Sequence, residues 1–229
     1  MATLLSLRDL LQHEIDDLYS AEEQIIAALP KMIEKASDRE LKKALSDHLK
    51  ITRAQKDRLD KVKAALGEKS EETKGFFQKL FGSTTKCKGT EGLIEEGEKM
   101  MSEDMDPTVM DAAIIASAQK IEHYEISGYG TARAYARELG LTNVQKLLEA
   151  TLAEEYEADD SLTVLALNKV NVEADKGNPR KQNNGMMPAA RKSAPSRAAK
   201  KSSPAKSAPK KAAKKKAAKK KTAGKASSR

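Results

Sequence analysis

Aliphatic residues recur every three or four positions along four long segments of this 229-residue chain. This spacing places them on one face of an α-helix, so each segment is predicted to be an amphipathic helix. The predicted helices cover about residues 6–35, 37–67, 106–139 and 142–174, and the apolar face of the last one extends through Leu167. No stretch of any length alternates between apolar and polar residues as a half-buried strand does. The sequence therefore predicts an all-α protein.

Residues at the predicted helix ends support these boundaries. The second helix is predicted to open at Ser37 or Asp38, and Ser37, three residues before Glu40, forms a capping-box pattern. Asp106 followed by Pro107 is typical of a helix start, and Gly140 is placed to end the third helix. Pro30 lies inside the first segment and predicts a kink or a helix end nearby.

A long connection separates the second and third predicted helices. Its apolar residues predict a small helix at Phe76–Phe81 that covers one end of the core, followed by a minor helix over about residues 91–103. Four long helices with one long crossover fit a four-helix bundle with a short extra helical segment in the crossover.

Charge divides the chain into two parts. From Lys176 to Arg229 there are 19 Lys and Arg and no Asp or Glu, whereas the first 175 residues carry 23 basic and 34 acidic residues. Pro, Ser, Ala, Lys and Gly dominate the C-terminal part, which cannot bury enough apolar surface to offset its ordering entropy. We therefore expect a helical domain over residues 1–174 and a disordered basic tail over residues 175–229.

Several classes of protein are excluded by composition. No apolar run approaches the roughly 18 residues that a membrane-spanning helix needs, and the N-terminus lacks the features of a secretory signal. The single cysteine, Cys87, excludes an internal disulfide framework and fits a reducing compartment. We expect a cytoplasmic protein without membrane insertion.

Polar side chains interrupt the apolar face of every long predicted helix near its middle. The interrupting residues are Glu22, then His48, Thr52 and Gln55, then Glu122, Glu125 and Tyr129, and finally Glu155 and Asp159. Unpaired buried carboxylates are costly, and several together are costlier still. One or two divalent or trivalent cations would neutralise them.

The interrupting residues therefore predict a metal site in the bundle core. Oxygen donors with one nitrogen suit iron, manganese or zinc better than a metal that prefers thiolates. The predicted ligands are Glu22, His48, Glu122, Glu125, Glu155 and Asp159. Thr52, Gln55, His123 and Tyr129 are expected to be hydrogen-bond partners of the ligands rather than ligands. The alternative for any single acid is a solvated position at the rim, because an inward assignment from periodicity can be off by one residue.

The segment from residue 1 to about residue 173 resembles the YciE/YciF-type ferritin-like family of bacterial stress-associated proteins over essentially its whole length. The segments that carry the resemblance are Asp17–Glu22, His48 with Thr52 and Gln55, Gly92–Glu96, Gln119–Ile126 with Tyr129–Gly130, and Leu148–Asp159. The run from Glu122 to Ile126 is the most specific of them. The resemblance implies a ferritin-like bundle, a two-metal centre and a tendency to dimerise, but it brings no settled activity.

The chain departs from the family pattern after its His-Leu pair. Relatives usually carry acidic residues there, whereas this chain has Lys50 and Ile51. If one of those acids is a ligand, this chain lacks a carboxylate from the second helix and binds fewer metals or binds them more weakly.

The C-terminal part resembles the Lys/Ala/Pro-rich arms of linker histones and bacterial histone-like proteins. Its Lys and Ala repeats carry no base-reading residues, so we expect contacts with DNA phosphates without sequence preference. The expected DNA-binding residues are Lys200, Lys201, Lys210, Lys211, Lys214, Lys215, Lys216, Lys219, Lys220 and Lys221. The alternatives are a solubilising tail or binding to RNA, a membrane surface or another polyanion.

The sequence supports two functional hypotheses. In the first, a stress-response protein tethered to DNA binds iron or manganese in its bundle and consumes peroxide or oxygen near the nucleoid, for example as a ferroxidase. In the second, a homodimeric bundle presents two basic arms that bridge or compact DNA, and its polar core is redox-inert.

Overall fold

The computed structural model describes residues 4–67 and 86–176. The helices are α1 (Leu7–Lys35), α2 (Arg39–Gly67), α4 (Lys88–Met101), α5 (Pro107–Glu138), α6 (Thr142–Leu165) and α7 (Asn171–Lys176), with a π-helical turn, η1 (Ala166–Val170), before α7. No strand occurs within these residues, which confirms the all-α prediction. The small helix predicted at Phe76–Phe81 and the lysines of the tail lie outside the described residues.

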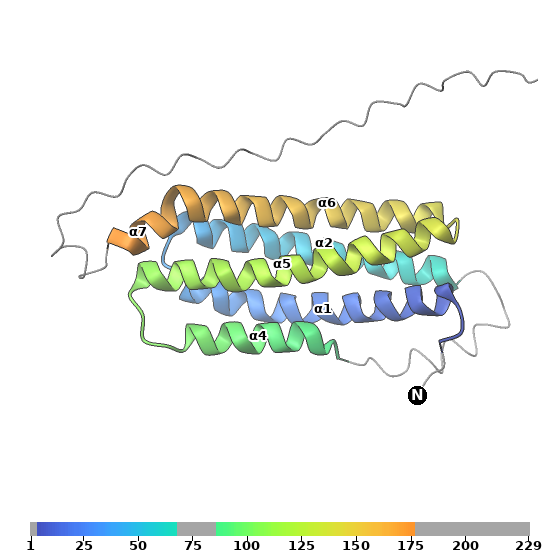
Figure 1. Ribbon diagram of the computed structural model, residues 1–229, viewed down its shortest axis with the longest axis horizontal. Coiled ribbons are helices and arrows are strands. Elements are labelled where there is room, and N and C mark those ends of the chain that lie inside the picture. The colour runs from blue at the N-terminus through green and yellow to red at the C-terminus, as the bar shows by residue number, and fades with distance from the viewer. Residues whose placement is uncertain (1–3, 68–85, 177–229) are drawn as a thin grey trace, which may run out of the picture. The chain divides into compact units, whose positions relative to one another are not determined.

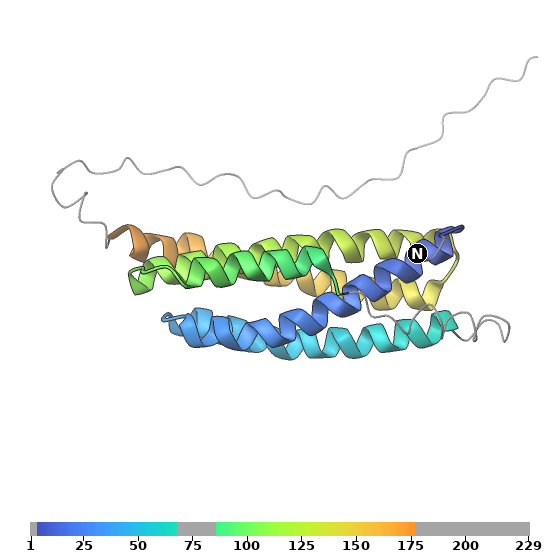
Figure 2. The same ribbon diagram turned by 90° about the horizontal axis from the view of Figure 1, so that it is seen from below.

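Helices α1, α2, α5 and α6 form a four-helix bundle (Figure 1). Both α1 and α6 pack against α2 and α5. Short turns join α1 to α2 and α5 to α6, whereas the connection from α2 to α5 returns along the bundle and contains α4 (Figures 1 and 2). This single long crossover is the ferritin-like arrangement, and α4 lies against α1 and α5. No helix among the described residues is both long and apolar enough to span a bilayer.

A buried carboxylate of α5 fixes the turn between α1 and α2. The backbone N–H groups of Ser37 and Asp38 donate to the two oxygens of Asp111 at 2.6 and 2.8 Å. The Asp38 side chain then caps α2 by accepting from the N–H groups of Glu40 and Leu41. The capping residue is therefore Asp38, and the capping box predicted at Ser37 does not form, because the N–H of Ser37 is engaged with α5.

The turn between α5 and α6 depends on the predicted glycine. Gly140 has a φ of +68°, a conformation that residues with a Cβ rarely adopt. The Gly140 N–H donates to the Arg137 carbonyl, and the Leu141 N–H donates to the Ala136 carbonyl. These two bonds form a Schellman motif, which satisfies carbonyls at the end of α5 and reverses the chain.

Two local features modify the predicted helix pattern. α1 continues through Pro30 to Lys35, so the proline does not end it. After α6, the π-helical turn shifts the register because it contains more residues per turn than an α-helix. Ala166 and Val170 are consequently buried, whereas Leu167, predicted on the apolar face, is 66% exposed.

The interior consists of two aliphatic clusters. One is built around Ile25, Leu29, Leu41, Leu45, Ile114, Ile121 and Leu162. The other is built around Leu11, Leu18, Leu59, Val62, Ala132, Leu148 and Leu152. On each of the four bundle helices, buried polar residues lie between members of the two clusters; they are Glu22, His48, Thr52, Gln55, Glu122, Glu125 and Glu155. The polar layer is therefore enclosed by apolar side chains along the bundle axis.

We expect Asp111→Ala to destabilise the bundle. The substitution leaves two N–H groups without their charged acceptor and should lower the free energy of unfolding by about 3 kcal/mol. Chemical denaturation of the full chain measures this change. Asp160→Ala, at an exposed position of α6, is the matched control and should change stability by less than about 0.5 kcal/mol. Equal stability of the two variants would contradict the anchoring role of Asp111.

Candidate metal centre

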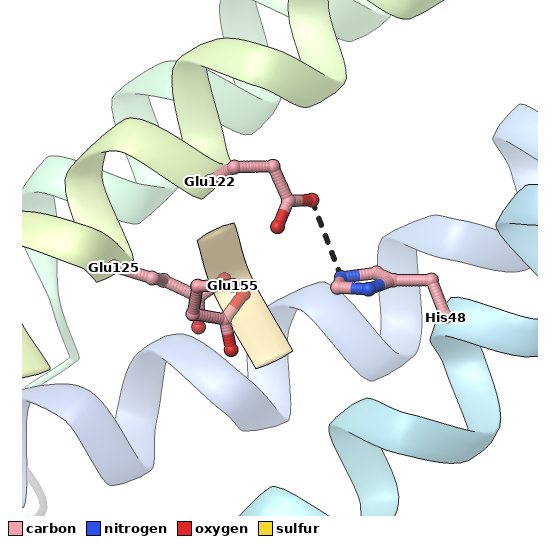
Figure 3. Close-up of side chains that lie close together, drawn as sticks. All are labelled: His48, Glu122, Glu125 and Glu155. Carbon is pink, nitrogen blue, oxygen red and sulfur yellow. Dashed lines mark ion pairs between the residues drawn. The ribbon is translucent and has the colours of Figure 1, made fainter. Parts of the chain in front are cut away.

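Four side chains from three helices converge between the two aliphatic clusters (Figure 3). His48 of α2, Glu122 and Glu125 of α5, and Glu155 of α6 each offer one ligand atom, and these atoms all lie within 4.8 Å of one another. His48 Nε2 lies 3.3 Å from Glu122 Oε1. We call these four residues the metal-ligand group. Glu22 of α1, also fully buried, adds a carboxylate to the same polar layer.

Helix geometry brings these side chains together. Glu122 and Glu125 are three residues apart, which places them on the same face of α5. Their neighbours at one further turn on either side, Ala118 and Tyr129, are buried as well, so this face of α5 points into the bundle over several turns. Glu122 and Glu125 therefore recur along α5 at the same helical spacing as the buried residues on either side of them.

Six buried polar atoms have no hydrogen-bond partner among the described residues. They are Glu22 Oε2, His48 Nδ1 and Nε2, Glu122 Oε2, Glu125 Oε1 and Glu155 Oε2. Buried polar atoms in native proteins nearly always have partners, and all six belong to predicted metal ligands. A cation would accept lone pairs from several of these atoms at once and neutralise the acids. The residues present therefore fit a metal ion.

Burial shifts the protonation of the whole layer. Desolvation raises the pKa of Glu22, Glu122 and Glu125 well above the usual 4.5, and the nearby Glu155 carboxylate raises each pKa further. Desolvation also raises the pKa of Glu155 to about 7 and lowers that of His48 to about 4. At neutral pH Glu22, Glu122 and Glu125 therefore retain protons, Glu155 is partly protonated, and the imidazole is neutral. A cation that binds here must displace protons from the carboxyl groups.

Two polar neighbours, Tyr129 and Gln55, form hydrogen bonds to carboxyl groups of the polar layer. The Tyr129 hydroxyl donates to Glu22 Oε1. Gln55 Nε2 donates to Glu155 Oε1. Each bond occupies one carboxylate oxygen and leaves the other, Oε2, without a partner, so both residues orient an acid without closing the site.

Asp159, His123 and Thr52, which were also predicted at the site, lie outside the metal-ligand group. Asp159 accepts from Gln119 Nε2 at 2.9 Å, and its Oδ2 lies 3.3 Å from Nε2 of His123, a residue whose side chain is 68% exposed. Thr52 is buried but donates to the backbone carbonyl of His48. Four residues advance an α-helix by slightly more than one turn, and this rotation carries Asp159 toward the rim.

Lys50 and Ile51 also lie outside the metal-ligand group. Lys50 Nζ lies 2.8 Å from Asp47 Oδ1 on the surface, and Ile51 is 38% exposed. Acids at these two positions would face outward from α2. The group therefore does not depend on them, and among the described residues α2 contributes its ligand atom through His48.

Sequence reasoning missed the residue that joins α2 to α6 beside the site. Arg58 donates to both carboxylate oxygens of Glu154 at 2.8 Å and to Thr151 Oγ1 at 2.6 Å. Its position three residues after Gln55 puts it near the inward face of α2, which is the signal that could have identified it.

A second cluster beside the site was also missed. Cys87 is buried, and its Sγ lies 3.0 Å from Asp17 Oδ2 and 3.1 Å from the Tyr124 hydroxyl. The Tyr124 hydroxyl in turn donates to Asp17 Oδ2. Seventy residues separate Asp17 from Cys87, so no local spacing pairs them.

Comparison with solved structures agrees with this architecture. The crystal structure of the Escherichia coli stress protein YciF matches with a TM-score of 0.65 and 38% identity, covering 73% of this chain and 99% of that one. YcfI from Rhodopseudomonas palustris matches with a TM-score of 0.62 and 43% identity, covering 69% and 94%. A protein from Xanthomonas campestris pv. campestris, 19% identical with a TM-score of 0.53, shares the fold.

Sequence comparison gives the same relationship. Protein YciF of Escherichia coli (strain K12) is 39% identical over 170 residues, which cover 74% of this chain and 96% of that protein. Residues 6–175 match the family model described as Domain of unknown function (DUF892). The chain therefore belongs to the DUF892 family, and through it to the YciF-like stress proteins.

Proposed function

We propose that this protein is a metal-binding stress protein whose bundle holds iron or manganese and whose basic tail tethers it to DNA. The observation that carries the metal site is the set of unpartnered buried atoms on Glu22, His48, Glu122, Glu125 and Glu155. Carboxylates with one imidazole suit iron and manganese. The relationship to the E. coli stress protein YciF supports a role in stress.

The donor set favours one tightly bound ion per chain. In two-metal carboxylate bundles two of the helices each supply a Glu-x-x-His pair, whereas the metal-ligand group here contains one imidazole, that of His48. Here Gln55 faces Glu155 from α2 with an amide that donates a hydrogen bond, and Tyr129 holds one oxygen of Glu22. A second ion would have to compete with both hydrogen bonds, so we expect it to bind more weakly than the first.

The residues of the chain prepare the site for chemistry with a small oxidant. A bound iron or manganese ion would supply one-electron redox chemistry toward oxygen or peroxide. The two aliphatic clusters exclude bulk water on both sides of the polar layer. The Tyr129 hydroxyl donates its proton in a hydrogen bond to Glu22, and the Gln55 amide orients Glu155 by donating to it. Oxidation of ferrous iron faster than in buffer tests this activity.

A second candidate function is a homodimer that bridges or compacts DNA with two basic arms. It is favoured by the charge of the tail and by the exposed apolar side chains of Tyr156, Val164 and Leu167, which follow one another at helical spacing. If the purified protein lacks metal and oxidises ferrous iron no faster than buffer does, the first function is excluded and this second function is the one that remains.

Metal content should depend on Glu125 and not on Asp159. Full-length protein purified without chelator is expected to contain about one iron or manganese ion per chain, measured by plasma mass spectrometry. Glu125→Gln removes a ligand charge with little change in shape and should lower the content by about tenfold or more. Asp159→Asn makes the same chemical change outside the metal-ligand group and should leave it unchanged. Equal loss in both variants, or no metal in the wild type, would contradict the assignment.

The pH dependence of stability should largely disappear when metal binds. In the metal-free protein the raised pKa of the buried acids means that the folded state holds protons that the unfolded chain releases above pH 4.5. The free energy of unfolding should therefore fall as pH rises through the Glu155 pKa of about 7. His48, whose pKa is lowered to about 4, has the opposite effect, but only below about pH 6.5.

Denaturation between pH 6.5 and 8, with EDTA or with saturating Mn²⁺, measures this difference. With Mn²⁺ the ligands are anions in the folded state, as they are in the unfolded chain at these pH values, so the free energy of unfolding should be nearly constant over the same range. Glu125→Gln in EDTA should show a shallower fall than the wild type, since one titrating acid is gone. Parallel curves with EDTA and with Mn²⁺ would show that the acids do not bind the ion.

Removal of residues 177–229 should abolish DNA binding and leave the bundle folded. Circular dichroism should retain its helical signal because α7 ends at Lys176. In gel-shift assays the full chain should bind DNA of any sequence, and its affinity should fall with salt with a slope of about −0.9 per phosphate contact. Retardation of DNA by the truncated chain would refute the tether.

A further inference from the structure

A pocket opens on the surface between α2 and α6 and ends at the metal-ligand group. Its volume is about 320 Å³, and His48 and Glu122 form its inner end. Ala44 of α2 and Ala158 and Ser161 of α6 are among its wall residues. We call this cavity the α2–α6 pocket.

The inner end of the α2–α6 pocket carries the polar atoms that lack partners. His48 is only 8% exposed, and neither ring nitrogen has a hydrogen-bond partner. Glu122 Oε2 also lacks one. The pocket therefore joins the protein surface to two of the four residues that converge on the candidate ion position (Figure 3).

Ion pairs bridge α2 to α6 and to η1 on either side of this pocket. On one side Arg58 pairs with Glu154. On the other side Lys169 Nζ lies 2.7 Å from Asp38 Oδ2 and 2.9 Å from Glu40 Oε1. Between these ion pairs, alanine and serine side chains are too short to fill the space between the helices, which explains why the opening lies here.

The charge around the opening suits a cation. Asp47, Glu154 and Glu157 line the pocket. Asp47 is bridged by two lysines and Glu154 by Arg58, whereas Glu157 is exposed and forms no ion pair with any residue that the structure describes. A cleft lined with negative charge raises the local concentration of cations.

We propose that the α2–α6 pocket is the route by which a divalent cation reaches and leaves the metal-ligand group. This inference rests on the proposed metal-binding function and adds the path to the site. A path affects the rates of binding and release together, because the ion crosses the same barrier in both directions. The dissociation constant is the ratio of the two rates, so narrowing or widening the path leaves it unchanged.

Stopped-flow absorbance with Co²⁺ on the full chain tests the route, since the visible spectrum of Co²⁺ reports its ligands. Ala158→Leu narrows the pocket and should slow both Co²⁺ uptake and its removal by EDTA by about tenfold. Ile51→Ala, at the partly exposed opening, should speed both steps. Ala116→Leu, at an exposed position of α5 away from the pocket, is the matched control and should keep wild-type rates.

The outcomes separate the route from the site. Unchanged rates in both Ala158→Leu and Ile51→Ala, with normal Co²⁺ binding in the wild type, would overturn the route and leave the metal site intact. A change in affinity without matched changes in both rates would also overturn it. Failure of the wild type to bind Co²⁺ would overturn the proposed function itself. If Ala158→Leu does not fold, the partly exposed Ile51→Ala decides the question.

Discussion

The burial of several carboxyl groups in an aliphatic bundle is the constraint on which the rest of this structure depends. Glu22, Glu122, Glu125 and Glu155 lie between two apolar clusters with one oxygen each that no described residue satisfies. An interior of this kind is tolerable if the acids are protonated or if a cation neutralises them. The same desolvation that makes the layer costly also raises the pKa of each acid, so fold stability and proton binding are linked, and the proposed metal binding would be linked to both.

Periodicity was sufficient to predict the fold and most of the polar layer. The long helices bury the side chains that their apolar spacing indicated, because every third or fourth residue must face the core whatever the details of packing. The sequence predictions fail where tertiary contacts or an irregular helical turn decide how a residue is placed. Ser37 does not cap α2 because Asp111, 74 residues away, holds its backbone. Leu167 is exposed because a π-helical turn, which no pattern in the sequence indicated, changes the register.

In the candidate site, too, helical periodicity predicts some positions, whereas contacts between helices decide others. Glu122 and Glu125 follow the inward face of α5, and the structure brings both into the metal-ligand group. Asp159 fits the same pattern on α6 but turns toward Gln119 and His123, a choice that depends on side chains from another helix. Arg58 was missed for a related reason, since its partner Glu154 lies almost a hundred residues further along the chain.

The ligand set is divided between the two helical hairpins of the bundle. His48 comes from the α1–α2 hairpin, whereas Glu122, Glu125 and Glu155 come from the α5–α6 hairpin. Neither hairpin alone contains the complete group, so an ion held by all four residues acts as a cross-link between halves that are far apart in sequence. Proteases attack chains that have transiently opened. The lifetime of this protein in a cell would therefore follow the supply of the metal, with chains made during scarcity degraded first.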